Sequence, residues 1–226
     1  MAVEKHINFF ELQAALEKPG CPLCAIIGNR AERYIDNMLF EHVSDRSFRA
    51  QYRAAGGFCG RHSRHLESFR DGLAVAILGR DLLEDRLAAL QKSRPYAPKG
   101  RCPVCEEEAR LEREYLGFLL QTSGDSADER ELRDAFCASD GLCFPHYGLL
   151  LDMARRGRRT FRRAEGRQAS AWLQNFQEGR FRDLLRRSSV FIELSAYGRQ
   201  EEFRNLSAGD QVVWKELSLS LRGGKS

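Results

Sequence analysis

Two stretches of this sequence share one pattern: Cys21-Pro22-Leu23-Cys24 and Cys102-Pro103-Val104-Cys105. Each is followed by a second cysteine motif, Gly57-Phe58-Cys59-Gly60-Arg61-His62 in the first case and Gly141-Leu142-Cys143-Phe144-Pro145-His146 in the second. The order CPxC and then CxxH therefore occurs twice, with 34 residues between the motifs in the first copy and 37 in the second. Apolar residues around the motifs also match in register, so we predict an internal tandem repeat.

Three cysteines and one histidine in each copy form a complete ligand set for a tetrahedral zinc ion. The two-residue gap within each motif allows both of its side chains to reach one ion. We therefore predict two structural zinc ions per chain, each bound inside one repeat. The expected ligands are Cys21, Cys24, Cys59 and His62 for the first ion, and Cys102, Cys105, Cys143 and His146 for the second. Cys137 lies outside the pattern.

Two other chemistries remain open for these residues. Three cysteines and a histidine can hold an iron–sulfur cluster when all four converge. A CxxC pair can also be a redox dithiol, although the βαβ context typical of that role is missing from the sequence. Covalent haem attachment is excluded, because Ala25 and Glu106 stand where a histidine is required.

The segments between the motifs have helical periodicity, and the sequence contains no convincing strand pattern, so we predict an all-α fold. The expected helices cover residues 7–17, 22–41, 45–55, 60–92, 103–121, 128–138, 145 to about 177, and 209–221. Pro22, Pro103 and Pro145 suit the first turn of a helix, and Ser44 and Ser207 suit the N-cap position. In this interpretation the helix after residue 45 returns the chain, so that Cys59 lies beside Cys21 and Cys24.

The segment from Arg94 to Gly100 contains two prolines and is predicted to link the two repeats. The sequence thus predicts three parts: a first metal-binding repeat at 1–93, a second at 94–157, and a basic helical region at 158–226 that packs on the repeats.

The chain has 226 residues, of which 42% are hydrophobic and 30% charged, as in soluble globular proteins. A secretory signal is missing, and the longest apolar stretch is too short to span a membrane, so we expect a cytoplasmic protein.

The formal net charge of +4 is unevenly distributed, because residues 155–187 contain 11 arginines and only three acidic residues. The candidate partner-binding residues are Arg155, Arg156, Arg158, Arg159, Arg162 and Arg163. An arginine-rich face with interleaved aromatic residues suits nucleic acid or another anionic partner. Alternatively it is only a solvated helix face, because Phe161, Ala169, Trp172 and Phe176 share one side and resemble a core stripe.

No catalytic motif is found in the sequence, which favours a non-enzymatic binding or adaptor module that contacts nucleic acid or a protein. The alternative is a metal-dependent redox or sensor protein that uses iron–sulfur or labile thiolate sites.

The doubled pattern resembles a family of uncharacterised bacterial and archaeal proteins with tandem CPxC and CxxH repeats. The likeness covers the chain from Cys21 to about Met153 and, more weakly, the segment Val213-Trp214-Lys215-Glu216. The resemblance implies a helical, cytoplasmic, metal-binding protein. It implies no activity, so no catalytic residue follows from it.

Overall fold

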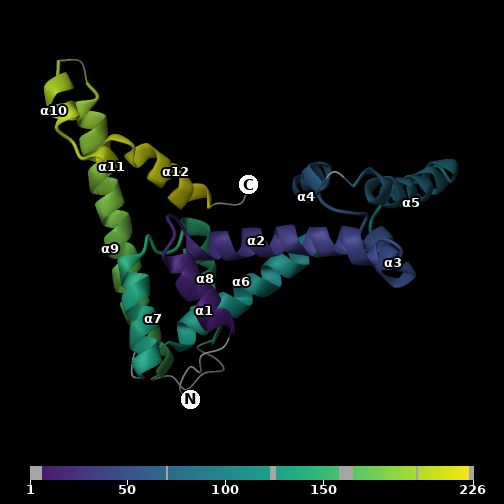
Figure 1. Cartoon of the computed structure of the whole chain (residues 1–226), viewed down its shortest axis with the longest axis horizontal. Helices are drawn as coiled ribbons and strands as arrows, with labels where there is room; N and C mark the ends of the chain where they lie inside the picture. The colour runs from purple at the N-terminus through teal and green to yellow at the C-terminus, as the bar shows by residue number, and fades with distance from the viewer. Residues whose placement is uncertain (1–6, 70, 123–125, 158–164, 197, 224–226) are drawn as a thin grey trace. The chain divides into compact units, whose positions relative to one another are not determined.

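A computed structural model of the chain describes residues 7–69, 71–122, 126–157, 165–196 and 198–223. Within these ranges the regular structure is helical and contains no strand, so the predicted all-α class is confirmed. The helices are α1 (Ile7–Leu16), α2 (Pro22–Asn37), the π-helical turn η1 (Met38–His42), α3 (Arg46–Ala54), α4 (Gly60–Leu66), the 3₁₀ turn η2 (Glu67–Phe69), α5 (Gly72–Gln91), α6 (Pro103–Gln121), α7 (Ala127–Ala138), α8 (Phe144–Gly157), α9 (Glu165–Leu194), α10 (Gln200–Arg204), α11 (Ala208–Gln211) and α12 (Val213–Arg222) (Figure 1).

Two long helices expected from the sequence differ from the observed elements. The helix expected over 60–92 is interrupted before Asp71, whose side chain accepts a hydrogen bond from Ala74 N at 2.9 Å and so caps α5. Of the helix expected over 145–177, the described residues contain α8, which reaches Gly157, and the first part of α9. The expected end near residue 177 is wrong, because α9 continues to Leu194.

The predicted helix starts are mostly confirmed. Pro22 and Pro103 are the first residues of α2 and α6, where a missing N–H costs no hydrogen bond. Ser207 caps α11 by accepting a hydrogen bond from Asp210 N at 3.1 Å. The prediction for Ser44 is wrong, because the side chain of Asp45 caps α3 instead.

Contacts between residues divide the chain into two compact units that do not follow the order of the sequence. Unit 1 contains residues 1–26 and 112–225, and unit 2 contains residues 27–111. Helices α2 and α6 each begin in one unit and end in the other. These boundaries differ from the divisions at 93 and 157 that were drawn along the sequence.

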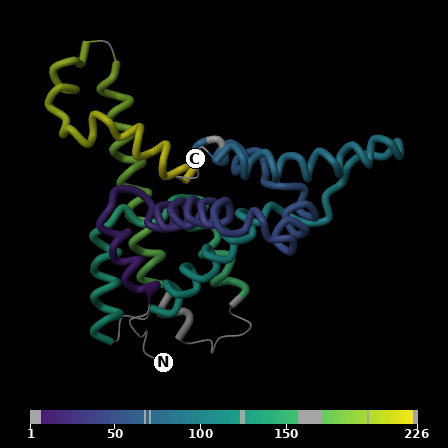
Figure 2. The backbone as a smooth tube through the Cα atoms, turned by 45° about the vertical axis from the view of Figure 1, so that its right-hand side comes forward, coloured from purple at the N-terminus to yellow at the C-terminus, as the bar shows by residue number. Residues whose placement is uncertain are grey.

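Unit 1 has a core of helices from both ends of the chain. Helix α1 packs on α7, α8 packs on α9, and α12 packs on both α8 and α9. The trace in Figure 2 turns at the end of α9 and returns through α10 and α11 into α12. Trp172 and Phe176 contact the buried Phe136 edge to face, with ring centroids 5.7 and 5.5 Å away. These two residues therefore pack in the core, while Phe161 and the side chain of Ala169 lie outside the described residues.

Unit 2 is built around a smaller core in which α3 packs on α5. Tyr52 of α3 is 2% exposed and contacts Phe58 edge to face at 5.1 Å. On the same helix, the Arg49 guanidinium donates to both carboxylate oxygens of the buried Asp81, at 2.6 and 2.5 Å. The Arg49 guanidinium holds the pKa of Asp81 below its usual value. This ion pair joins α5 to α3.

Candidate metal centres

Each of the four cysteine motifs begins a helix. The carbonyl groups of Cys21, Cys59, Cys102 and Cys143 accept the first helical hydrogen bonds of α2, α4, α6 and α8, at 2.8–3.2 Å. The second ligand of each motif lies three residues further on, so it shares a side of the helix with the first. The positive end of each helix dipole favours a thiolate at this place.

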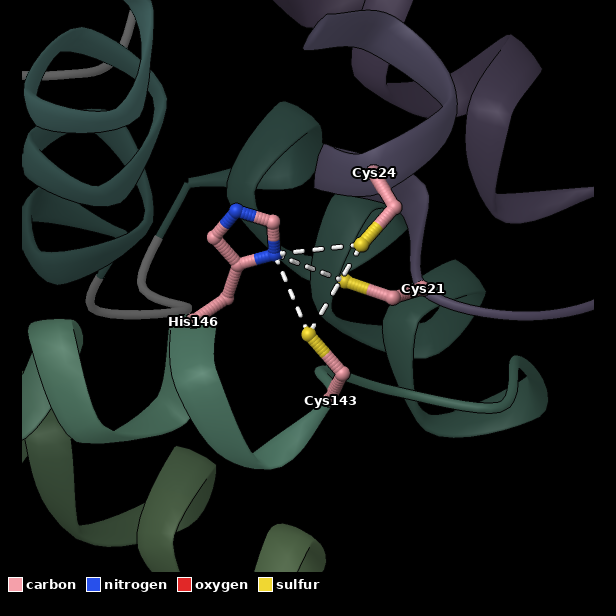
Figure 3. A group of neighbouring side chains, drawn as sticks. All are labelled: Cys21, Cys24, Cys143 and His146. Carbon is pink, nitrogen blue, oxygen red and sulfur yellow. Dashed lines mark hydrogen bonds between the residues drawn. The ribbon is translucent and has the colours of Figure 1, made fainter. Parts of the chain in front are cut away.

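The structure gathers the eight candidate ligands into two groups of four. Metal group 1 consists of Cys21, Cys24, Cys143 and His146, all in unit 1. Figure 3 shows His146 Nδ1 directed at the three sulfur atoms, which lie 3.2–3.4 Å from it. The Sγ atoms of Cys24 and Cys143 are 3.7 Å apart.

Metal group 2 consists of Cys59, His62, Cys102 and Cys105, all in unit 2. His62 Nδ1 lies 3.3–3.5 Å from the three sulfur atoms. The Sγ atoms of Cys59 and Cys105 are 3.6 Å apart. The two groups therefore have closely similar inner geometry. Cys137, which the sequence pattern leaves out, belongs to neither group and is exposed.

The partition of the ligands differs from the one predicted. Neither repeat completes its own ligand set, because each CPxC motif joins the CxxH motif of the other copy. The reason lies in the segment between the motifs. Helix α2 alone carries the chain about 24 Å from Cys21 at 1.5 Å per residue, whereas the nine residues of α3 recover only about 13 Å. After α3 the chain turns instead of extending back, because Gly56 N and Gly57 N donate to Arg53 O and Tyr52 O at 3.0 and 2.9 Å. Cys59 therefore remains in unit 2.

The linker between the copies completes metal group 2. The N–H groups of Lys99 and Gly100 both donate to the carbonyl of Ala54, at 2.8 and 3.0 Å, at the end of α3. The Tyr96 hydroxyl donates to the carbonyl of Arg53 at 3.3 Å. These bonds bring the start of α6 to the loop that follows α3. The segment expected to separate two repeats is thus a strap within one unit.

Side chains rather than a strap hold the loops of metal group 1. The buried Gln177 of α9 accepts a hydrogen bond from Leu142 N at 2.8 Å and donates to Leu142 O at 2.7 Å. Asp140 accepts a hydrogen bond from Gly20 N at 2.7 Å, which ties the loop before α2 to the loop before α8. Gly141 has a φ of 69°, and a Cβ there would lie 2.7 Å from Gln177 Oε1. Glycine is required at this close approach.

A glutamate carboxylate lies near Nε2 of each histidine, the ring nitrogen that faces away from the sulfur atoms. His62 Nε2 is 3.3 Å from Glu108 Oε1, and His146 Nε2 is 3.5 Å from Glu112 Oε1. At His62 this contact is a hydrogen bond, which fixes the ring with Nδ1 toward the sulfur atoms and makes that nitrogen a stronger ligand, whereas the longer contact at His146 is within ion-pair distance only. Neither glutamate was predicted from the sequence. The local signal is limited to Glu108, which follows the ligand Cys105 of its own group by three residues on α6, whereas Glu112 is near no ligand of its own group in the sequence.

The carboxylate of metal group 2 has a further partner. Arg61 Nη1 donates to Glu108 Oε1 at 2.9 Å, and Arg61 Nη2 donates to Glu108 Oε2. Arg61 is the residue directly before the ligand His62, so one helical turn supplies both the ligand and the cation that orients its carboxylate.

The electrostatics of both groups favour a bound cation. Burial and the adjacent thiols of Cys143 and Cys24 raise the pKa of Cys21, while hydrogen bonds from Cys143 and Cys21 lower the pKa of Cys24. Burial and the neighbouring Cys59 raise the pKa of Cys105 to about 12. Three adjacent thiolates repel one another, so a cation is needed to ionise all three.

The distances within each group match one tetrahedral ion. Zinc bonds of about 2.3 Å to sulfur and about 2.0 Å to nitrogen place ligand sulfurs about 3.8 Å apart, and sulfur and nitrogen about 3.5 Å apart. The S···S distances of 3.6 and 3.7 Å and the N···S distances of 3.2–3.5 Å are close to these values. The residues present therefore fit a single metal ion in each group.

The arginine-rich segment is described only in part. Arg158, Arg159, Arg162 and Arg163 lie outside the described residues. Arg156 pairs with Asp152 at 2.8 Å on the surface of α8. Further along, Arg187 of α9 pairs with Asp210 at 2.5 Å and Glu216 at 2.7 Å, and so joins α9 to α11 and α12. This part of the basic segment is neutralised by carboxylates of its own unit.

The fold and these groups define the class of protein: an all-helical protein with two Cys3His groups able to bind metal ions. Within the described ranges, none of the helices combines the length and the apolar character that a membrane span requires.

Comparison with known proteins links the chain to a protein without an assigned role. The chain is 29% identical over 140 residues to an "Uncharacterized 23.9 kDa protein in xynA 3'region" of Caldicellulosiruptor sp. (strain Rt8B.4). The match covers 58% of this chain and 66% of that protein, slightly less than two thirds of its length. No family model and no solved structure matches the chain.

Proposed function

We propose that this chain is a non-enzymatic helical binding module whose two units are each stabilised by one structural zinc ion. The observation that carries the proposal is the closed ligand set: four ligand atoms within 4.8 Å of one another in each group, with a carboxylate behind the histidine. Structural zinc sites have four protein ligands, whereas catalytic sites keep one position for water or substrate.

Ligand spacing also favours zinc over an iron–sulfur cluster. A cluster places several iron and sulfide atoms between its ligands, so the ligands must stand further apart than around one ion. The compact groups suit a mononuclear ion, and Cys3His is a common structural zinc set. An iron-based redox or sensor protein is the competing function.

Elemental analysis combined with an absorption spectrum tests this proposal, on protein purified both in air and without oxygen. We expect two zinc ions per chain, no visible absorption, and loss of one ion in each of Cys24→Ser and Cys105→Ser. Cys137→Ser is the matched control and keeps both ions. Iron with acid-labile sulfide and a visible band would overturn the zinc assignment and favour the redox function.

The partner class of this module is an anionic macromolecule, and we propose nucleic acid bound through the residues around Arg155–Arg163. The support is the density of arginine in this segment and the surface position of Arg156, whose ion pair with Asp152 is exposed. Binding would fall steeply with salt, because phosphate contacts release counterions.

Affinity for single- and double-stranded oligonucleotides at several salt concentrations tests this partner. Replacing Arg158, Arg159, Arg162 and Arg163 by Gln is expected to weaken binding at least tenfold. Replacing the exposed Arg33, Arg46, Arg64 and Arg94 by Gln changes the net charge equally and is expected to have a smaller effect. Equal effects of the two variants would show that only net charge matters, and would remove this face as a binding site.

A further inference from the structure

Helix α5 of unit 2 carries apolar residues on two sides. Its inner side, with Ala74 and Leu78, is buried against the core of unit 2. Its outer side exposes four leucines, at 74%, 56%, 48% and 68% of their surface: Leu73, Leu83, Leu87 and Leu90. Figure 2 shows α5 as one long continuous helix. A surface helix that needs only one packed face does not require these leucines.

The exposed leucines follow the spacing of a coiled-coil seam. Together with Ala76 and Arg80, which are also exposed, they occupy positions separated alternately by three and four residues. That spacing selects another α-helix as the partner, because a and d residues on one helix fit between those of a second. The stripe runs for about 26 Å along α5.

The charged residues on and beside the stripe determine which helix can pair with α5, and whether that helix runs parallel or antiparallel to it. In a parallel pair of α5 helices, Arg80 would face the same arginine of the second copy in the middle of the seam, and like charges repel. In an antiparallel pair with a two-fold axis near residues 81 and 82, Arg80 lies in the layer of the partner's Leu83 and beside the partner's Glu84. Within the chain, the exposed Glu84 lies 3.7 Å from Arg80 and 3.8 Å from Arg53 of α3. Both pairs are long and solvent-exposed, and such pairs contribute little, so Glu84 can exchange them for an ion pair across the axis.

We propose that the outer face of α5 is an interface for a second copy of this chain, which packs as an antiparallel two-helix coiled coil. In a two-fold arrangement the stripe of one copy packs against the same stripe of the other copy. Leu73 then contacts Leu90, Ala76 contacts Leu87, and Arg80 contacts Leu83 of the other copy. The interface lies on a face that the metal groups do not use, and it adds self-association to the proposed binding function.

Sedimentation velocity of the metal-loaded full chain over a wide concentration range tests the proposal. We expect a concentration-dependent change from the 25.8 kDa monomer to a particle of twice that mass. Leu83→Glu is expected to remain monomeric, with its metal content and helical circular dichroism unchanged. Leu185→Glu, a change at an exposed leucine of α9 in unit 1, is the control and is expected to dimerise like the wild type.

The antiparallel direction has its own test. Arg80→Glu places two acidic residues together at each symmetric contact and is expected to weaken the dimer at least tenfold. The double variant Arg80→Glu/Glu84→Arg exchanges the charges and is expected to restore it. A parallel pair would stay weak in the double variant, because the two introduced glutamates would still face each other in the seam. A wild type that is monomeric at every concentration, or a dimer that Leu83→Glu leaves intact, would overturn the proposal.

Discussion

In metal group 2, backbone hydrogen bonds from Lys99 and Gly100 to Ala54 bring the two cysteine loops together, whereas in metal group 1 a buried side chain, Gln177, clamps the loop before α8. The surroundings of the two histidines differ as well. Burial lowers the pKa of His62, but the adjacent sulfurs and a glutamate outweigh burial and raise the pKa of His146 to about 11.

The two groups also differ in which residues lie over their sulfur atoms. A Cβ on Gly223, at the end of α12, would lie 3.3 Å from Cys143 Sγ, so the C-terminal helix reaches the sulfur atoms of metal group 1. A cavity of about 270 Å³ beside this group is lined by Cys21, Cys143 and residues of α12, including Lys215 and Leu219. The same ligand chemistry is thus supported by a backbone strap in unit 2 and by side chains of α9 together with the C-terminal helix in unit 1. Identical ligand sets can therefore depend on entirely different parts of a chain.

The largest expected effect comes from double variants that distinguish the observed ligand partition from the one within repeats. With the observed partition, Cys24→Ser/Cys143→Ser removes two ligands from one group, so one ion per chain remains. Cys24→Ser/Cys59→Ser removes a ligand from each group, so both ions are lost, with an apparent cost of order 10 kcal/mol for each lost site. Metal content and helical circular dichroism measure this. The opposite result would restore the repeat-by-repeat partition.

Gln177→Ala is expected to affect unit 1 alone. It leaves the N–H and carbonyl of Leu142 without their buried partner, which costs about 2–3 kcal/mol. Denaturant unfolding of metal-loaded protein measures the loss, and competition with a chelator is expected to show weaker metal binding at group 1 only. Gln174→Ala, on the same helix and partly exposed, is the control. Equal metal loss from both groups would contradict the separate supports described above.

Asp81→Asn is the matching change in unit 2. It removes the charged acceptor of Arg49 and is expected to cost about 2–3 kcal/mol of unfolding free energy. Because the folded pKa of Asp81 is below its usual value of about 3.9, its contribution is complete above that pH and is lost as pH falls through the folded pKa.

The effect of Asp81→Asn is therefore expected to be constant between about pH 8 and about pH 5. Denaturant unfolding at several pH values in this window checks the constancy. Asp152→Asn, which breaks the exposed pair with Arg156, is the control and is expected to cost less than about 1 kcal/mol. A penalty that already fades near about pH 6 would mean that the pKa of Asp81 is not held low.

The smallest expected effects come from the carboxylates behind the histidines. Glu108→Gln and Glu112→Gln keep a hydrogen-bond acceptor but lose the charge, so each is expected to weaken metal binding about tenfold at its own group. We expect the larger effect for Glu108, because Arg61 fixes its position against His62. Chelator competition on each variant measures the ranking. If Glu112→Gln weakens metal binding more than Glu108→Gln does, Arg61 does not strengthen the contact between Glu108 and His62.

Local signals in the sequence were enough to predict the helical class and the residues that gather at metal groups. Helical periodicity, the prolines in the first turns and the two motif types carry that information without any tertiary contact. Trp172 and Phe176 were also recognisable as core residues from their helical spacing, and their contacts with Phe136 agree with it.

The partition of the ligands, in contrast, depends on tertiary packing. It follows from the lengths of α2 and α3, from the turn after α3, and from where the 94–100 linker binds. Glu108, Glu112 and Gln177 were not recognised in the sequence because their partners lie between 34 and 46 positions away along the chain. A motif specifies which atoms can bind a metal ion, but long-range packing determines which of them can meet.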